Sequence, residues 1–185
     1  MLDYVEPIFS VPLFHFKVED WNNKKKTLLE IVNNKELHYE RGNFVYTDYI
    51  EEDGVFPSSD VDPIVNELIN EEVNRFSRYA QVDLLPMNYW FEKSLKNDHH
   101  LVHNHGGTGF SAVMFIEYDE RVHKPTGLLS PISPWLKKLE IGNVVFPENI
   151  KSGSIIYFPS FINHFTIPNE SEKERIILSW NMVEK

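Results

Sequence analysis

The sequence predicts an α+β chain in which a jelly-roll barrel of short strands is packed on two helices. Helical periodicity is confined to two segments in the first half. From Met87 onward, short apolar and β-branched segments alternate with glycine and proline turns. A hydrophobic share of 42% and an aromatic share of 14% are typical of a folded globular protein. Two helices followed by roughly seven or eight strands favour this architecture.

The length of 185 residues suits one domain with a full core and is short for two. We expect a single domain over residues 1–185. Within it, residues 1–86 supply an N-terminal strand and the supporting helices, and residues 87–185 form the jelly-roll core. No repeat, low-complexity segment or linker interrupts the chain.

The first 50 residues contain one expected strand, one expected helix and one further extended segment. Ile8–Val18 is rich in aromatic and β-branched residues and predicts a strand, which Pro12 either places at a sheet edge or interrupts. Asp20–Asn33 predicts a helix capped by Asp20, with Leu28, Leu29 and Val32 on its buried side. Asn43–Ile50 is expected to be extended.

A second helix is expected to begin at Asp62-Pro63 and to reach about Tyr79. Aspartate is a good N-cap, and proline is favoured at the first helical position. The apolar positions keep a helical period and predict a face toward the core: Ile64, Val65, Leu68, Ile69, Val73 and Phe76.

The second half is expected to be a series of short strands. Gly106–Gly109 predicts a turn, and the proline-containing section Arg121–Gly142 is looser and is expected to cover the site. The expected strands are Met87–Leu95, Leu101–His105, Phe110–Tyr118, Val144–Phe146, Ser154–Phe158 and Arg175–Val183. On the first of these strands, Tyr89 and Lys93 share a face and are candidates for lining a pocket.

Composition excludes several classes of function. Eighteen Lys and Arg against 28 Asp and Glu give a net charge of −10, which argues against nucleic acid as a partner. The sequence has no cysteine, so a metal would be held by histidine and carboxylate, and a reducing cytoplasm is expected. No apolar run approaches the ~20 residues of a membrane span, and the first residues lack the features of a signal peptide.

Four of the eight histidines lie between Asp98 and His105. On a strand over Leu101–His105, His103 and His105 would share one face and could reach one metal ion. The alternative is a histidine-rich strand end that faces water. His164 favours the metal site, because it follows a glycine turn, an apolar strand and a Pro-Ser break, which places it at a barrel mouth.

Arg175 follows 11 residues after His164 and begins the last strand. There it shares a face with Ile177, Ser179 and Asn181, whereas the opposite face is apolar. Arginine, serine and asparagine facing a barrel interior predict a ligand pocket. An ion pair of Arg175 with a neighbouring surface glutamate is the alternative. Tyr157, just before the Phe-Pro-Ser turn, is a further candidate donor to a carboxylate.

Three motifs carry a family resemblance: His103-Asn104-His105-Gly106 leading into Ser111–Ile116, Gly153 to His164, and Arg175–Asn181. In this order and spacing the chain resembles the iron(II)- and 2-oxoglutarate-dependent dioxygenases, specifically their short prolyl-hydroxylase-like bacterial and phage forms. The resemblance runs from about Trp90 to Asn181. It implies a double-stranded β-helix, the cupin-like jelly roll.

The resemblance also implies a reaction. Fe(II) would be held by His103, His105 and His164, and Arg175 would bind the far carboxylate of 2-oxoglutarate. The enzyme would hydroxylate a C–H bond of a small-molecule or peptide substrate and release succinate and CO2, with ascorbate as an external reductant. Ser179, Asn181 and Tyr157 would complete the cosubstrate pocket.

The chain departs from the family pattern at one ligand. The family usually has Asp or Glu where this chain has His105. Either His105 is a third histidine ligand, or His103 and His164 alone bind the metal and His105 lies beside them. Two different functions are also compatible with these residues: a three-histidine cupin-like metalloenzyme that does not use 2-oxoglutarate, and a non-catalytic jelly-roll metal-binding module.

Overall fold

The computed structural model describes residues 10–49, 62–107, 109–131 and 144–185. Its helices are α1 (Trp21–Asn34) and α2 (Pro63–Ala80). A large antiparallel sheet has the order β1-β9-β6-β11-β4-β3-β2, and a small one has the order β5-β10-β7-β8. The strands of the large sheet are β1 (Phe14–Lys17), β2 (His38–Glu40), β3 (Val45–Thr47), β4 (Leu84–Ser94), β6 (Phe110–Glu117), β9 (Ser154–Pro159) and β11 (Arg175–Glu184). Those of the small sheet are β5 (His100–His103), β7 (Gly127–Leu129), β8 (Val144–Val145) and β10 (His164–Thr166).

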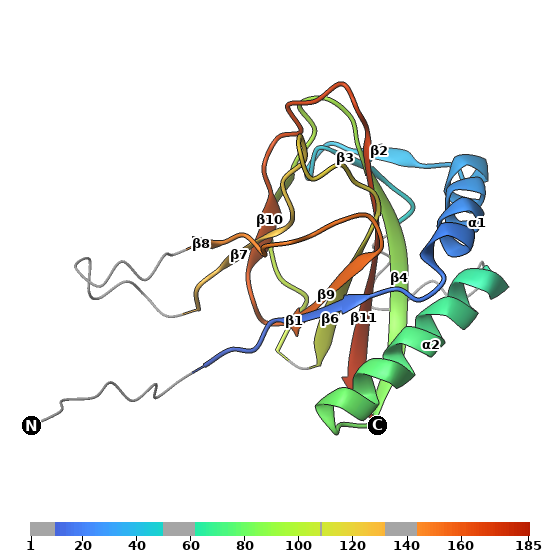
Figure 1. The fold of residues 1–185 in the computed structure, drawn as a ribbon. Helices are drawn as coiled ribbons and strands as arrows, with labels where there is room; N and C mark the ends of the chain where they lie inside the picture. Colours follow the sequence, from blue (N-terminus) through green and yellow to red (C-terminus); the bar gives the residue numbers. More distant parts are fainter. Residues whose placement is uncertain (1–9, 50–61, 108, 132–143) are drawn as a thin grey trace, which may run out of the picture.

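The elements form three layers (Figure 1). Helices α1 and α2 cover the outer face of the large sheet, and the small sheet lies on the inner side. Two antiparallel sheets that enclose an interior, with helices outside, confirm the predicted α+β jelly-roll architecture.

Alternation along the central strands produces two separate cores. On β11, Ile176, Leu178, Trp180 and Met182 point outward into a cluster with the helices. Ile177 points inward, into a second cluster. The inner cluster also contains Phe115 of β6 and Phe158 of β9. Successive side chains of a strand point to opposite faces, so β6, β9 and β11 each contribute to both cores.

The helix termini differ in how they are capped. Asp62 accepts hydrogen bonds from the backbone N–H groups of Ile64 and Val65 at 2.9 and 3.2 Å, as predicted. Asp20 is the N-cap of α1 by position, but its φ is 51° and its carboxylate accepts from the Asn23 side chain instead of the backbone. The capping bond expected of Asp20 is therefore absent.

Ile64 corrects the expected core face of α2. It is 54% exposed, whereas the other apolar residues of that face are buried: Val65, Leu68, Ile69, Val73 and Phe76. At about 100° per residue, Ile64 lies at the edge of the helical stripe that the buried residues form, although the next residue, Val65, is fully buried.

Several boundaries differ from those the sequence predicts. Strands β2, β7 and β10 have three residues each, too few to show a period, and the sequence pattern predicts none of them. Strand β5 ends at His103, so His105 follows the strand. Strand β1 occupies only part of Ile8–Val18. Parts of three expected segments lie outside the described residues: 8–9, 50 and 132–142. Within the described part of the chain, no helix is long and apolar enough to cross a membrane.

Candidate metal centre

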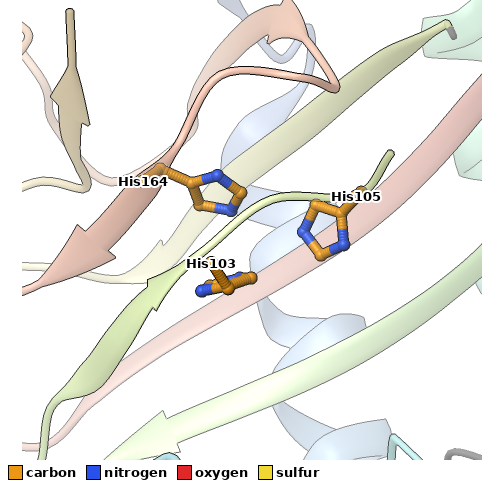
Figure 2. Close-up of side chains that lie close together, drawn as sticks. All are labelled: His103, His105 and His164. Carbon is orange, nitrogen blue, oxygen red and sulfur yellow. The ribbon is translucent and has the colours of Figure 1, made fainter. Parts of the chain in front are cut away.

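Three histidines meet inside the barrel near its small sheet (Figure 2). His103 is the last residue of β5, His105 follows two residues later, and His164 begins β10. Strands β5 and β10 pair with His103 opposite His164, which brings distant parts of the chain together. One ring nitrogen from each histidine lies within 4.8 Å of the others. This spacing suits three ligands of one metal ion.

Backbone carbonyls fix two of the three imidazoles. The carbonyl oxygen of Leu101 accepts a hydrogen bond from His103 Nδ1 at 2.8 Å, and that of Ile162 accepts one from His164 Nδ1 at 3.0 Å. With Nδ1 protonated in this way, Nε2 keeps its lone pair for a metal. Each histidine binds the carbonyl two residues before it, so the chain itself sets both ring orientations.

His105 is held differently. Its backbone N–H donates to the carbonyl of Ser160 at 3.0 Å, and its ring lies 5.2 Å from that of Trp90. Among the described residues, its imidazole makes no hydrogen bond. The position of His105 therefore depends on the backbone after β5 and on packing.

The three imidazoles are neutral at physiological pH. Burial and the neighbouring imidazoles lower the pKa of His105 to about 4. The same causes lower the pKa of His103 and bring that of His164 well below its usual value. Because a metal needs the neutral lone pair, this environment favours binding.

A buried carboxylate, that of Glu92, lies beside the triad of His103, His105 and His164, and lines the same cavity, the triad cavity. The sequence pattern does not predict it. Glu92 Oε1 accepts from Trp90 Nε1 at 3.0 Å, and Glu92 Oε2 lies 3.2 Å from His100 Nδ1. The His100 ring stacks on that of His103 at 4.0 Å. Burial would raise the pKa of Glu92, but the charge and hydrogen bond of His100 lower it below its usual range. Burial would lower the pKa of His100, and Glu92 raises it.

The alternation of side chains along β4 could have predicted that Glu92 faces the interior. The odd-numbered Tyr89 and Lys93 are the pocket candidates that the sequence suggests on this strand. Instead Trp90 and Glu92 line the triad cavity, and Lys93 pairs with Glu174 at 2.5 Å. The even-numbered residues of β4 thus face the interior. Trp90 pairs with Ser179 and Ser94 with Arg175, so these residues of β4 and β11 lie on the same side of the sheet.

Arg175 is buried at the start of β11 with part of its guanidinium unpaired. Its Nη1 donates to the carbonyl of Lys124 at 3.3 Å, but its Nε and Nη2 have no hydrogen-bond partner among the described residues. Nearby Glu172 and Glu174 pair with lysines instead, Lys96 and Lys93 respectively. The alternative of a surface ion pair is therefore wrong, since the side chain is only 4% exposed.

Burial lowers the pKa of Arg175, and Glu92 and Tyr118 act in the opposite direction. Arginine stays charged even so, because its reference pKa is far above neutrality. A second unpaired buried group is the hydroxyl of Thr126, which lines the cavity of the three histidines. Thr126 lies two residues after Lys124, whose carbonyl accepts from Arg175. A buried cation and a buried hydroxyl without partners fit an anionic ligand that can accept from both.

The other predicted pocket residues have three different placements. Ser179 lines the triad cavity. Asn181 lies two residues farther along β11, where its amide accepts from Ser111 Oγ at 2.8 Å and donates to Asn88 Oδ1 at 3.1 Å. Arg175 lines a separate cavity with Ser94, His123 and Asn169.

Tyr157 lies outside the pocket, which corrects its expected role as a donor. On β9 its neighbours Ile156 and Phe158 point inward, so Tyr157 points outward. There its ring stacks on Phe76 at 4.2 Å, and its hydroxyl donates to the backbone carbonyl of Glu72 at 3.4 Å.

Comparison with known proteins supports the interpretation of the three histidines as the metal centre of an oxygenase. A family model described as "Putative 2OG-Fe(II) oxygenase" matches residues 88–181, half of the chain. The search of curated proteins returned no match.

Solved structures share the fold at low sequence identity. A Pseudomonas putida prolyl-4-hydroxylase has a TM-score of 0.64 and 11% identity, covering 94% of this chain and 92% of that one. The viral collagen prolyl hydroxylase of Paramecium bursaria Chlorella virus-1, in complex with 2OG, has a TM-score of 0.62, 13% identity and coverages of 92% and 94%. HygX from Streptomyces hygroscopicus, with nickel, 2-oxoglutarate and hygromycin B bound, has a TM-score of 0.65, 9% identity and coverages of 94% and 83%.

The matched segment begins in β4 and ends in β11, so it contains the triad, Glu92 and Arg175. The jelly-roll barrel and its histidine cluster agree with that assignment. The chain belongs to the family of 2OG-Fe(II) oxygenases.

Proposed function

We propose that the protein is an Fe(II)- and 2-oxoglutarate-dependent dioxygenase that hydroxylates a C–H bond of a second substrate. One O2 supplies both oxygen atoms: one enters the alcohol, and the other enters succinate as 2-oxoglutarate loses CO2. The observation that carries the proposal is the joint presence of a neutral histidine triad and an unpaired buried arginine on one barrel interior.

His103, His105 and His164 would hold the iron. Neutral imidazoles suit Fe(II), and three of them leave coordination positions open for other ligands. The bound iron supplies the activation of oxygen, and the protein positions the reactants and excludes water. The Leu101 and Ile162 carbonyls keep two of the rings oriented before any metal arrives.

Arg175 would bind the far carboxylate of 2-oxoglutarate, with Thr126 as a second donor. The free Nε and Nη2 of Arg175 offer the planar fork that pairs with a carboxylate through two hydrogen bonds. Ser179 lines the space near the triad and is a further polar contact for the cosubstrate. Ascorbate would act outside the pocket as the reductant that keeps iron as Fe(II).

Oxygen-dependent conversion of 2-oxoglutarate to succinate tests the proposal. We expect Fe(II)-loaded protein to form succinate, and His103→Ala and Arg175→Met to lose this activity. Tyr157→Phe is the matched control, because Tyr157 lies on the outer face, and it should stay active. Succinate formation that persists in His103→Ala, or none with the unaltered protein, would contradict the proposal.

A second candidate function follows from His105. Because this residue occupies the position where the family usually has a carboxylate, the competing function is a three-histidine metalloenzyme that does not use 2-oxoglutarate. It predicts metal binding that 2-oxoglutarate leaves unchanged. The unpaired guanidinium of Arg175 favours the oxygenase.

A further inference from the structure

A second cavity, of about 180 Å³, adjoins the triad on the side of the β2–β3 hairpin. It shares His103 and His105 with the metal centre. The part of its lining that the structure describes includes neither Arg175 nor Thr126. The cavity thus reaches the metal centre from a wall that the cosubstrate residues leave free.

The hairpin that forms this wall is fixed to the barrel. The ring of Phe44 stacks on that of His99 at 4.6 Å, and the Phe44 carbonyl accepts from the His99 N–H at 3.1 Å. Strand β3 pairs with β4, with Thr47 opposite Glu92. The wall is therefore preorganised, which lowers the cost of binding a ligand against it.

Charge in the cavity is uneven. Its described lining contains no Lys or Arg, and its ionisable groups other than the metal ligands and Tyr49 are Glu40, Glu92 and His100. Glu92 and His100 face each other at 3.2 Å. Glu40 accepts from Asn43 Nδ2 at 2.7 Å and makes no ion pair within the described part of the chain. Among the side chains of the described lining, one carboxylate is therefore left without a compensating cation.

Aromatic rings line the cavity beside these groups. Tyr49 and Trp90 meet at 5.2 Å with an interplanar angle of 61°. The faces of such rings attract cations, most strongly where water is partly excluded. An uncompensated carboxylate and two aromatic rings favour the same class of ligand.

We propose that this cavity binds the second substrate through an ammonium or guanidinium group that pairs with Glu40 near Tyr49 and Trp90. A neighbouring C–H bond of that substrate would then lie toward the histidine triad. The substrate class is therefore a lysine or arginine side chain or a small amine. The identification of the bound compound as a substrate rests on the proposed function, but its binding requires neither 2-oxoglutarate nor oxygen.

The test compares two probes of equal chain length on ¹⁵N-labelled, Zn(II)-loaded protein: Nα-acetyl-lysine methylamide and Nα-acetyl-norleucine methylamide. The Trp90 indole N–H reports on the cavity, because it donates to Glu92. We expect the lysine probe to bind at least about fivefold more tightly than the neutral probe, because one partly exposed ion pair increases affinity by about this factor. The preference should shrink as salt is raised.

Glu40→Gln should abolish the preference for the lysine probe, and Glu36→Gln, at an exposed position after α1, should keep it. Equal binding of both probes, a preference that survives Glu40→Gln, or no signal change up to about 20 mM probe would overturn the proposal. Should Glu40→Gln not fold, the salt dependence in unaltered protein decides. Cation binding without succinate formation would refute the oxygenase and leave this site standing, and the reverse result would refute only this site.

Discussion

The two faces of the large sheet are made by the same strands, and both bury apolar side chains, but charged and hydroxyl side chains of β11 lie on the inner face. The outer face of β11 presents Leu178 and Trp180 to the helices. The inner face presents Arg175 and Ser179 to the cavities. Burying apolar side chains stabilises the fold, whereas burying unpaired polar groups destabilises it. The inner face therefore carries groups whose partners are expected to come with a ligand.

Each face also contains a buried carboxylate, and the two differ in the direction of their pKa. Glu72 of α2 is buried against the outer face, and burial raises its pKa despite Arg75 at 3.0 Å. The pKa of Glu92 on the inner face is lowered, because His100 and Trp90 outweigh burial. The environment of Glu92 thus favours a negative charge beside the triad, whereas the environment of Glu72 disfavours one against the outer face.

One of the two largest effects on stability is expected on the outer face. Leu178→Ala removes a fully buried side chain and should lower the free energy of unfolding by about 3 kcal/mol, as large-to-small core substitutions do. Urea unfolding measures this. Ile64→Ala is the control, because Ile64 is 54% exposed, and should change it by no more than about 0.5 kcal/mol. Equal losses in both variants would break the distinction between buried and exposed positions.

Glu92→Gln should destabilise metal-free protein by about 3 kcal/mol, because it leaves His100 buried without its anion. Since the folded pKa of His100 is raised, the pair contributes fully below the unfolded value of 6.5, and the contribution is lost as pH rises through the folded pKa. Since that of Glu92 is lowered, its contribution is lost only in acid, below 4.5.

The difference in unfolding free energy between the unaltered protein and Glu92→Gln should therefore be largest between pH 4.5 and 6.5 and should decrease above it. A difference that is constant from pH 5 to pH 9 would show that the pair is not charged in the folded state.

His103 and His105 are expected to contribute equally to metal affinity, although a hydrogen bond to a carbonyl orients the ring of His103, and the backbone and packing position His105. His103→Ala and His105→Ala should each lower Fe(II) affinity by at least about 100-fold, because a ligand matters more than the groups that orient it. Anaerobic competition with a chelator measures both affinities. A much smaller loss for His105→Ala would place His105 beside the metal instead of on it.

Removing the unpaired cation should separate stability from binding. Arg175→Met is expected to leave the metal-free protein as stable or to stabilise it by about 1 kcal/mol, because a buried charge without a partner is replaced by an apolar chain. The rise in melting temperature that 2-oxoglutarate causes in the unaltered protein should disappear in the variant. Strong destabilisation would mean that the contacts of Arg175 within the protein, such as its hydrogen bond to the Lys124 carbonyl, outweigh the cost of burying its charge.

The smallest effect belongs to Glu72. Its folded pKa is raised, so the unaltered protein loses stability as pH rises from the unfolded value of 4.5 through the folded value. Glu72→Gln lacks this loss, and its stability relative to the unaltered protein should rise between pH 4 and pH 7. Denaturant unfolding at both pH values measures it, and an opposite trend would show that the pair with Arg75 dominates.

Residues with a strong periodic context are predictable from the sequence. The alternation on Arg175–Val183 and the spacing of His103, His105 and His164 place the right side chains toward the interior. The alternation depends on local geometry, which a strand imposes regardless of its partners. The histidine cluster depends in addition on the pairing of β5 with β10, which brings His164 opposite His103, and on the backbone after β5, which holds His105.

The features that the sequence does not predict depend on contacts between distant segments. The pattern does not exclude Tyr157 from the pocket, because the face of a short apolar strand is ambiguous when both faces are buried. Glu92 escapes prediction because its partner His100 comes from the other sheet. The role of Thr126 is not predicted, because whether a buried hydroxyl has a hydrogen-bond partner depends on the folded surroundings and not on the local sequence.

Anaerobic addition of 2-oxoglutarate to the Fe(II)-loaded protein tests the central claim most directly. The claim predicts a weak visible charge-transfer band that saturates with 2-oxoglutarate in the unaltered protein and in Tyr157→Phe. In Arg175→Met the same band should require far more 2-oxoglutarate, with iron still bound. No band in the unaltered protein, or an identical titration of Arg175→Met, would contradict the claim that the inner face holds the metal at one end and the cosubstrate carboxylate at the other.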